Sequence, residues 1–156
     1  MGAISEILLI ALCIIIPLII FGASIEKKRV KKIKILLLSM DKKYKGFIEK
    51  QIVLDVINNN KIDGFESFID NIFIILKPEI EGLISIVNTP ESSNISIEHD
   101  SEYFKNIPPL FESYFNRENK NIPISEDDIQ KINETVKSAI RADLRMRELD
   151  LKIGHI

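Results

Sequence analysis

Residues 7–25 read ILLIALCIIIPLIIFGASI, nineteen consecutive residues without a charged side chain. As a helix this run is about 28 Å long at ~1.5 Å per residue, close to the ~30 Å hydrocarbon thickness of a bilayer. A helix satisfies its own backbone hydrogen bonds, as any segment that crosses lipid must. The run therefore predicts a transmembrane anchor within residues 1–25. Pro17 is compatible with it, because membrane helices tolerate proline better than soluble helices do.

A cleaved secretory signal is the main alternative for the same residues. Such a signal begins with basic residues, has an apolar core of about 7–15 residues, and ends with small residues three and one before the cut. Here the only charged side chain before Ile7 is Glu6, and the apolar core is longer. Phe21 stands at the first of the two small-residue positions in Phe21-Gly22-Ala23. We therefore expect the segment to be retained as an anchor.

The orientation of this anchor follows from the charges beside it. Six basic residues crowd its C-terminal flank: Lys27, Lys28, Arg29, Lys31, Lys32 and Lys34. The N-terminal flank contains neither Lys nor Arg. Because basic flanks stay in the cytoplasm, we expect a single-pass protein of the cell membrane with its N-terminus outside and residues 26–156 in the cytoplasm. The same cluster also attracts anionic lipid headgroups.

Charge is divided unevenly along the 156 residues. Residues 1–50 carry ten basic and four acidic groups, net +6, and residues 51–156 carry eleven basic and nineteen acidic groups, net −8. An acidic distal part repels phosphate, so nucleic acid is not an expected partner. Cys13 is the single cysteine and lies in the apolar run, which excludes an intramolecular disulfide and a cysteine-based metal site.

After the anchor we expect a basic stalk helix over residues 26–58, followed by an acidic, mainly helical cytoplasmic domain over residues 59–156. Proline is absent from the stalk, and Gly46 is its weakest helical position. The apolar stretch 33–40, IKILLLSM, is too short for a second span. It is expected at the membrane interface or buried against the domain.

Residues 63–98 allow two interpretations. Apolar residues recur at helical spacing from Phe65 to Leu76, which predicts a helix ending at Lys77-Pro78. Pro78 then suits the first turn of a second short helix. Alternatively, LISIV (83–87) and NISIE (94–98) alternate in the manner of a short β-hairpin. Further on, Pro108-Pro109 interrupts the chain before a short helix over residues 110–115.

The last element is a long amphipathic helix over residues 125–153. Ser125 followed by three acidic residues resembles a capping box and complements the helix dipole. One apolar stripe consists of Ile129, Ile132, Val136, Ile140 and Leu144, and a second, rotated stripe consists of Ala142, Met146, Leu149 and Ile153. Either both stripes pack on the domain's own helices, or part of this surface binds a partner helix or a second copy. The candidate partner face is Ile129, Ile132, Val136, Ile140, Leu144, Met146 and Leu149.

Residues that carry chemistry are scarce. His99 lies among acidic residues in ISIEHDSE, but no second histidine stands at metal-ligand spacing, so a solvated polar loop is expected. Residues 59–70 mimic a calcium loop, yet Lys61 occupies a ligand position and Asp70 replaces the bidentate Glu. There is no P-loop, dinucleotide fingerprint or nucleophile elbow. The sequence therefore predicts no catalytic residue, metal, cofactor or small-molecule ligand.

Together these features predict a mainly α, non-enzymatic, membrane-anchored subunit or adaptor that holds protein partners at the bilayer. An anchor confines diffusion to two dimensions and so raises the effective concentration of whatever it binds. The alternative is a small membrane-acting toxin, immunity factor or exclusion factor, whose transmembrane helix is itself the functional part.

Overall fold

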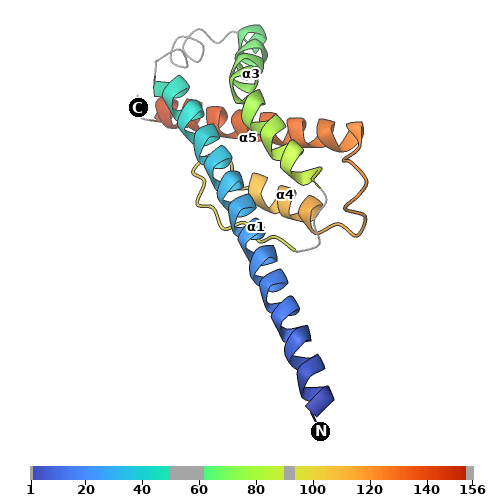
Figure 1. Ribbon diagram of the computed structural model, residues 1–156. Coiled ribbons are helices and arrows are strands. Elements are labelled where there is room, and N and C mark those ends of the chain that lie inside the picture. Colours follow the sequence, from blue (N-terminus) through green and yellow to red (C-terminus); the bar gives the residue numbers. More distant parts are fainter. Residues whose placement is uncertain (1, 50–61, 90–93, 154–156) are drawn as a thin grey trace.

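The computed structural model describes the backbone of residues 2–49, 62–89 and 94–153, and the side chains of residues 11–49, 64–89 and 94–150. In these ranges the chain forms four helices: α1 (Gly2–Glu49), α3 (Ile62–Val87), α4 (Ile107–Phe115) and α5 (Glu126–Ile153). The expectation of a mainly helical protein is confirmed. Figure 1 shows the C-terminal half of α1 packed among the other helices, while its N-terminal half projects away from them.

Helix α1 has two parts with opposite surroundings. From residue 11 to residue 25 every side chain is exposed, although nearly all are apolar. From Ile33 onward the side chains Ile33, Leu37, Met40 and Tyr44 are at most 2% exposed and belong to the core of the domain. The predicted helix is therefore present over residues 26–49, and the stretch 33–40 is partly buried against the domain. Residues 50–58 of the predicted stalk lie outside the described residues.

In the part of the chain whose side chains are described, no helix is long and apolar enough to cross a membrane. That part of α1 begins at Ala11, so residues 7–10 of the run lie outside it.

Helix α3 runs antiparallel to α1. Arg29 contacts the end of α3 at Ile86, whereas Lys43 contacts its middle at Ile75 and Glu79. The two helices come close at Gly82, where an added Cβ would lie 3.1 Å from Cδ1 of Leu36. Glycine at this position therefore permits the close approach.

The prediction that α3 ends at Lys77-Pro78 is wrong, because the helix continues through Pro78 to Val87. The ring of Pro78 is exposed, while Leu76 and Ile80 on either side of it are at most 1% exposed. A proline inside a helix costs about 3 kcal/mol. Burial of the apolar residues before and after Pro78 offsets that cost. A break in the helix at Pro78 would remove one of these two groups from the core.

The β-hairpin interpretation is also wrong. Residues 83–87 are the last turns of α3, and no strand occurs within the described ranges. Residues 94–98 have no regular secondary structure, although their side chains alternate as expected: Ile95 and Ile97 are buried and Ser96 is exposed. Side chains of the α4 region take the place of a second strand. The N–H of Ile95 donates to Oδ1 of Asn116, and the N–H of Ile97 donates to Oε1 of Glu112.

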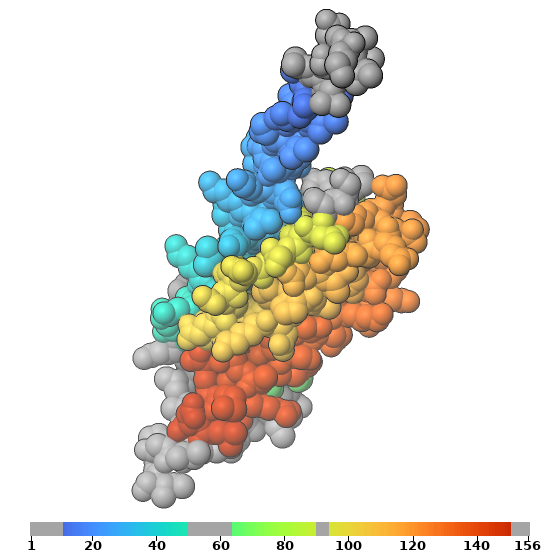
Figure 2. All heavy atoms as spheres, turned by 90° about the horizontal axis from the view of Figure 1, so that it is seen from below, coloured from blue at the N-terminus to red at the C-terminus, as the bar shows by residue number. Residues whose placement is uncertain are grey.

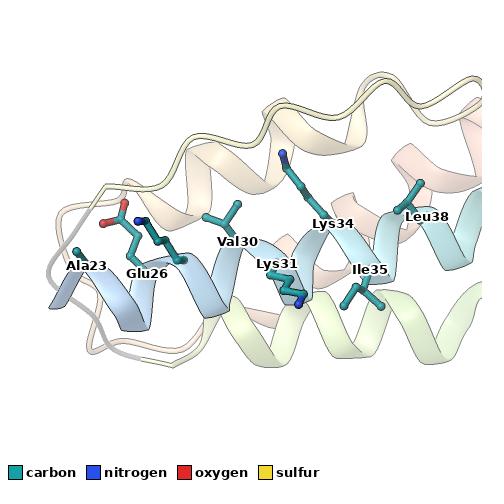
Figure 3. A pocket seen from close by; sticks show the side chains of 8 residues that line it. Ala23, Glu26, Val30, Lys31, Lys34, Ile35 and Leu38 are labelled. Atoms are coloured by element: carbon teal, nitrogen blue, oxygen red, sulfur yellow. The ribbon is translucent and has the colours of Figure 1, made fainter. Parts of the chain in front are cut away.

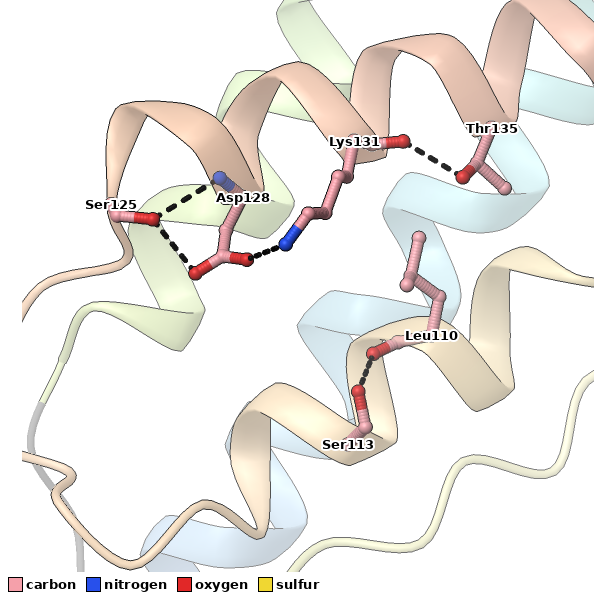
Figure 4. Close-up of polar contacts among 6 residues, drawn as sticks. All are labelled: Leu110, Ser113, Ser125, Asp128, Lys131 and Thr135. Atoms are coloured by element: carbon pink, nitrogen blue, oxygen red, sulfur yellow. Dashed lines mark hydrogen bonds and ion pairs between the residues drawn. The ribbon is translucent and has the colours of Figure 1, made fainter.

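Helices α4 and α5 begin with different N-terminal features. Pro108 and Pro109 were predicted to interrupt the chain before α4. They lie within its first turn instead, where their missing N–H groups need no partner. At the start of α5, Oγ of Ser125 accepts the N–H of Asp128 at 3.1 Å and donates to the Asp128 carboxylate at 2.8 Å (Figure 4). The predicted serine cap is therefore present, and the predicted helix 125–153 agrees with the observed bounds to one residue.

Helices α1, α3, α4 and α5 and the extended segment before α4 contribute to a single hydrophobic core. Helix α3 contributes Ile69, Ile72 and Leu83, each 0% exposed, and α4 contributes Phe111. The inward positions of α5 are Ile132, Val136, Ile140 and Leu144, each 0% exposed, and Ile95 and Phe104 of the extended segment are each 1% exposed.

Candidate functional site

The six basic residues after the apolar run do not form one uniform surface. Lys27, Lys28, Lys31 and Lys32 are exposed, and Lys34 is half-buried. Arg29 is different, since it is only 8% exposed. The predicted headgroup and topology cluster therefore consists of five lysines that reach the surface and one arginine whose contacts lie within the domain.

Arg29 joins three elements of the domain. Its guanidinium donates to the carbonyl oxygens of Ile86 and Thr89 at the C-terminal end of α3, the latter at 2.8 Å. It also lies over the ring of Phe115 in α4, 5.1 Å from the ring centroid. A cation at a helix C-terminus compensates carbonyls that have no partner within the helix. Arg29 therefore fastens α3 and α4 to α1 immediately after the apolar run.

The outward face of α1 carries a shallow groove with mixed chemistry (Figure 3). Its lining is largely apolar at Ala23, Val30, Ile35 and Leu38, and basic at Lys27, Lys31 and Lys34, with Glu26 at one end. Ile35 and Leu38 line this groove together with the lysines and are 54% and 57% exposed. The sequence signal for this face was present but weak, because residues 33–40 are apolar at most positions and only the helical phase separates inner from outer residues.

The predicted partner face of α5 is divided between the core and the surface. Ile132, Val136, Ile140 and Leu144 are each 0% exposed and pack inside the chain itself, and Ile129 is half-buried. Met146 and Leu149 are 59% and 53% exposed. The first stripe therefore packs on the domain's own helices, and the surface available to a partner narrows to the C-terminal turns of α5.

The expected solvated polar loop is present at Glu98 and Asp100, which are exposed, but His99 itself is withdrawn from water. Its side chain is 6% exposed, and its Nε2 lies 3.4 Å from Oδ2 of Asp41 on α1. Ser101 donates to the other oxygen of Asp41 at 2.8 Å and accepts the N–H of Phe104 at 2.7 Å. In a catalytic triad the histidine lies between serine and carboxylate and accepts the serine proton. Here the carboxylate lies between the other two, so the group attaches the 94–104 segment to α1 and does not activate a nucleophile.

A second polar contact joins α1 to α3. Lys43 Nζ lies 2.7 Å from Oε1 of Glu79, and Ser39 Oγ donates to the same oxygen at 3.0 Å. The Glu79 side chain is 10% exposed and that of Lys43 is 38% exposed. Glu79 is thus a nearly buried carboxylate whose charge is balanced by a lysine that still reaches water.

A third polar cluster joins α1 to α5. Tyr44 donates its hydroxyl to Asp143, which also accepts from Nε of Arg147 at 2.8 Å. The Arg147 guanidinium lies over the ring of Tyr103, and Tyr103 meets Tyr44 edge-on with ring centroids 4.7 Å apart. Burial, together with the hydrogen bond to Asp143, raises the pKa of the Tyr44 phenol far above its usual range. This cluster fixes the crossing of α5 over α1.

None of these clusters has the composition of a metal or cofactor centre. Among residues whose side chains are described, no group of three or more His, Cys, Asp or Glu side chains is placed to hold a metal ion. Comparison with known proteins finds no matching protein-family model, no similar curated protein and no similar solved structure. The candidate functional features are therefore the surfaces of this chain: the exposed apolar half of α1, the groove on its outward face, and the exposed end of α5.

Proposed function

We propose that this chain is a single-pass membrane protein without enzymatic activity, which serves as an anchored subunit or adaptor and holds protein partners at the bilayer. In this proposal residues 7–25 span the membrane, the N-terminus lies outside the cell, and the helical domain lies in the cytoplasm. The lysines that reach the surface beside the span support this orientation, because basic flanks are retained in the cytoplasm.

One observation carries the proposal: α1 is a single helix with an exposed apolar half and a buried half. The large apolar side chains from Leu12 to Phe21 are between 48% and 66% exposed. Exposing so much contiguous apolar surface to water is unfavourable, at roughly 25 cal/mol per Å². A lipid environment removes that cost. The same helix continues into the core of the domain, so no non-helical linker separates the proposed anchor from the domain.

The groove on the outward face of α1 supports a protein as the partner. Leu38 lies thirteen residues after Ile25, which is about 20 Å along the helix axis. The headgroup layer extends only about 5–8 Å beyond the hydrocarbon core on each side. Ile35 and Leu38 therefore lie beyond lipid when α1 stands upright. An acidic partner segment with apolar residues would complement these two side chains and the lysines around them.

The test is the composition of the complex that copurifies with a C-terminally tagged chain in mild detergent. We expect other proteins to copurify, and we expect Ile35→Asp with Leu38→Asp to reduce their recovery at least several-fold. Ile74→Asp is the matched control, because Ile74 on α3 is 63% exposed and lies outside the groove. Met146→Asp with Leu149→Asp tests the exposed end of α5 in the same way.

Two results would contradict this proposal. A bare monomer or a homo-oligomer in the copurification would remove the adaptor role. A version in which residues 7–25 are scrambled at constant hydrophobicity should keep its partners. If scrambling abolished function instead, the span itself would be the functional part. Orientation is tested separately with a C-terminal reporter that is active only in the cytoplasm.

A further inference from the structure

The position of Arg29 brings one end of the domain to the membrane boundary. Arg29 lies four residues after Ile25, the last residue of the apolar run, which is about 6 Å along the helix axis. Its bonds to Ile86 and Thr89 place the C-terminal end of α3 at the same level. No flexible linker separates the proposed span from the domain, since α1 is helical throughout this region.

The connection between α4 and α5, residues 116–125, lies at this same end. Phe115 immediately precedes it and packs under the Arg29 guanidinium. At its other end, the N–H of Ile124 donates to Oδ1 of Asn88 at 2.8 Å, and Asn88 is next to Thr89. Figure 1 shows this connection, in orange, at the end of the domain from which the apolar half of α1 projects. Figure 2, from below, shows orange atoms at one edge of the domain, to one side of the projecting half of α1.

The connection contains one strongly exposed aliphatic side chain in a defined backbone conformation. Ile122 is 61% exposed. Its N–H donates to the carbonyl of Asn119 at 3.2 Å, and its own carbonyl accepts from the Arg117 guanidinium. These bonds close a turn and fix the backbone on which the side chain is exposed. Ile122 is therefore exposed within an ordered turn.

Charges of both signs lie near Ile122. The connection contains Arg117, Glu118 and Lys120, and the acidic residues 126–128 follow it at the start of α5. Lys27 and Lys28 of α1 are exposed near the level of Arg29. An apolar side chain among charged residues suits the boundary between headgroups and acyl chains.

We propose that residues 116–125 form a second membrane contact, in which Ile122 enters the headgroup region of the bilayer beside the proposed span. This inference rests on the proposed function, because it requires residues 7–25 to cross the membrane. The domain then lies directly against the lipid on one side, and Ile35 and Leu38 lie farther along α1, about 15 Å and 20 Å beyond Ile25. The second contact fixes the rotation of the domain about the anchor, so that the groove faces a constant direction.

The test uses the full chain in vesicles of phosphatidylcholine and phosphatidylglycerol. Cys13, the single cysteine, is replaced by Ala, and one cysteine is introduced in turn at Ile122, Ile74 or Ile20 for an environment-sensitive fluorophore. Ile74 is the matched control, because it is 63% exposed and Ile122 is 61% exposed. Ile74 also lies far from the proposed membrane, since the adjacent residue Ile75 contacts Lys43. Lys43 lies fourteen residues beyond Arg29, about 21 Å farther from the membrane.

We expect blue-shifted emission and strong quenching by nitroxide-labelled lipids at positions 20 and 122, and several-fold weaker quenching at position 74. Quenching at position 20 with none at position 122 would overturn the second contact and leave the anchor intact; position 122 would then be a free surface or a protein contact. Absence of quenching at position 20 would overturn the anchor, and the second contact with it. Equal quenching at positions 74 and 122 would also overturn this inference.

Discussion

The side chain of Asn116 binds both backbone groups of Ile95. Oδ1 of Asn116 accepts the N–H of Ile95 at 3.0 Å, and Nδ2 donates to the carbonyl of Ile95 at 3.2 Å. An adjacent strand would offer the same pair of bonds to a residue in a sheet. A single amide at the end of α4 thus allows an extended segment to lie on a helical core with its backbone satisfied, and Ile95 to be 1% exposed.

Asn116→Ala should lower the free energy of unfolding by about 1–3 kcal/mol, because it leaves two partly buried backbone groups without partners. Asn116→Asp should have a smaller effect, since the carboxylate still accepts from the Ile95 N–H. Urea unfolding of the full chain in detergent gives the free energies, and hydrogen exchange at Ile95 reports the local effect. Asn121→Ala, at an exposed position, is the control. An Ile95 amide that stayed protected in Asn116→Ala would show that the interaction does not hold this segment.

The ion pair between Lys43 and Glu79 should respond asymmetrically to substitution. Lys43→Met leaves a nearly buried carboxylate with only Ser39 as a partner and should cost about 1–3 kcal/mol. Glu79→Gln keeps the acceptor, and Lys43 still reaches water, so we expect less than ~1 kcal/mol. Lys77→Met is the control for losing an exposed pair, because Lys77 and Glu81 are 58% and 63% exposed and should contribute about 0.5 kcal/mol or less. Equal losses for Lys43→Met and Glu79→Gln would contradict this explanation.

Two glycines in the helices should respond oppositely to alanine. An added Cβ at Gly46 would meet no atom within 4 Å, so Gly46→Ala should stabilise the chain by about 0.5–1 kcal/mol through helix propensity. At Gly82 the new methyl group would press on Leu36, so the same propensity gain should be offset. Thermal unfolding in detergent measures both variants. In a Leu36→Ala background the benefit of Gly82→Ala should return, and failure to recover it would mean that Leu36 is not the obstacle.

The Tyr44 phenol should make stability depend on alkaline pH. Its pKa in the folded protein is raised by burial and by Asp143, whereas the unfolded chain has the ordinary value of about 10. The folded state therefore favours the protonated phenol, and this contribution is fully present below pH ~10 and is lost as the pH rises above it. Tyr44→Phe should remove this part of the pH dependence. The comparison is the loss of unfolding free energy between pH 8 and pH 11 in the two proteins; equal losses would contradict the role given to Tyr44.

The elements that sequence alone determined are those with a long, regular pattern. Ser125 and the apolar spacing after it located α5 to within one residue, because the cap and the 3.6-residue period are local properties. The apolar run and the lysines that follow it could also be identified from the sequence alone. The outward groove of α1 was visible only as an apolar stretch, and nothing in the sequence distinguishes Ile122 from any other loop residue.

Tertiary contacts decided the rest, because the deciding partner lies far away in the sequence. Pro78 ends a helix by local rules, but α3 continues because the core holds Leu76 and Ile80 on both sides of it. Arg29 belongs to a basic cluster by sequence, yet the end of α3 and the ring of Phe115 withdraw it from the surface. The His99 side chain is only 6% exposed because Asp41, 58 residues earlier, provides a partner. Local patterns set which segments are helical and which faces are apolar, while long-range packing selects which polar groups remain available for binding.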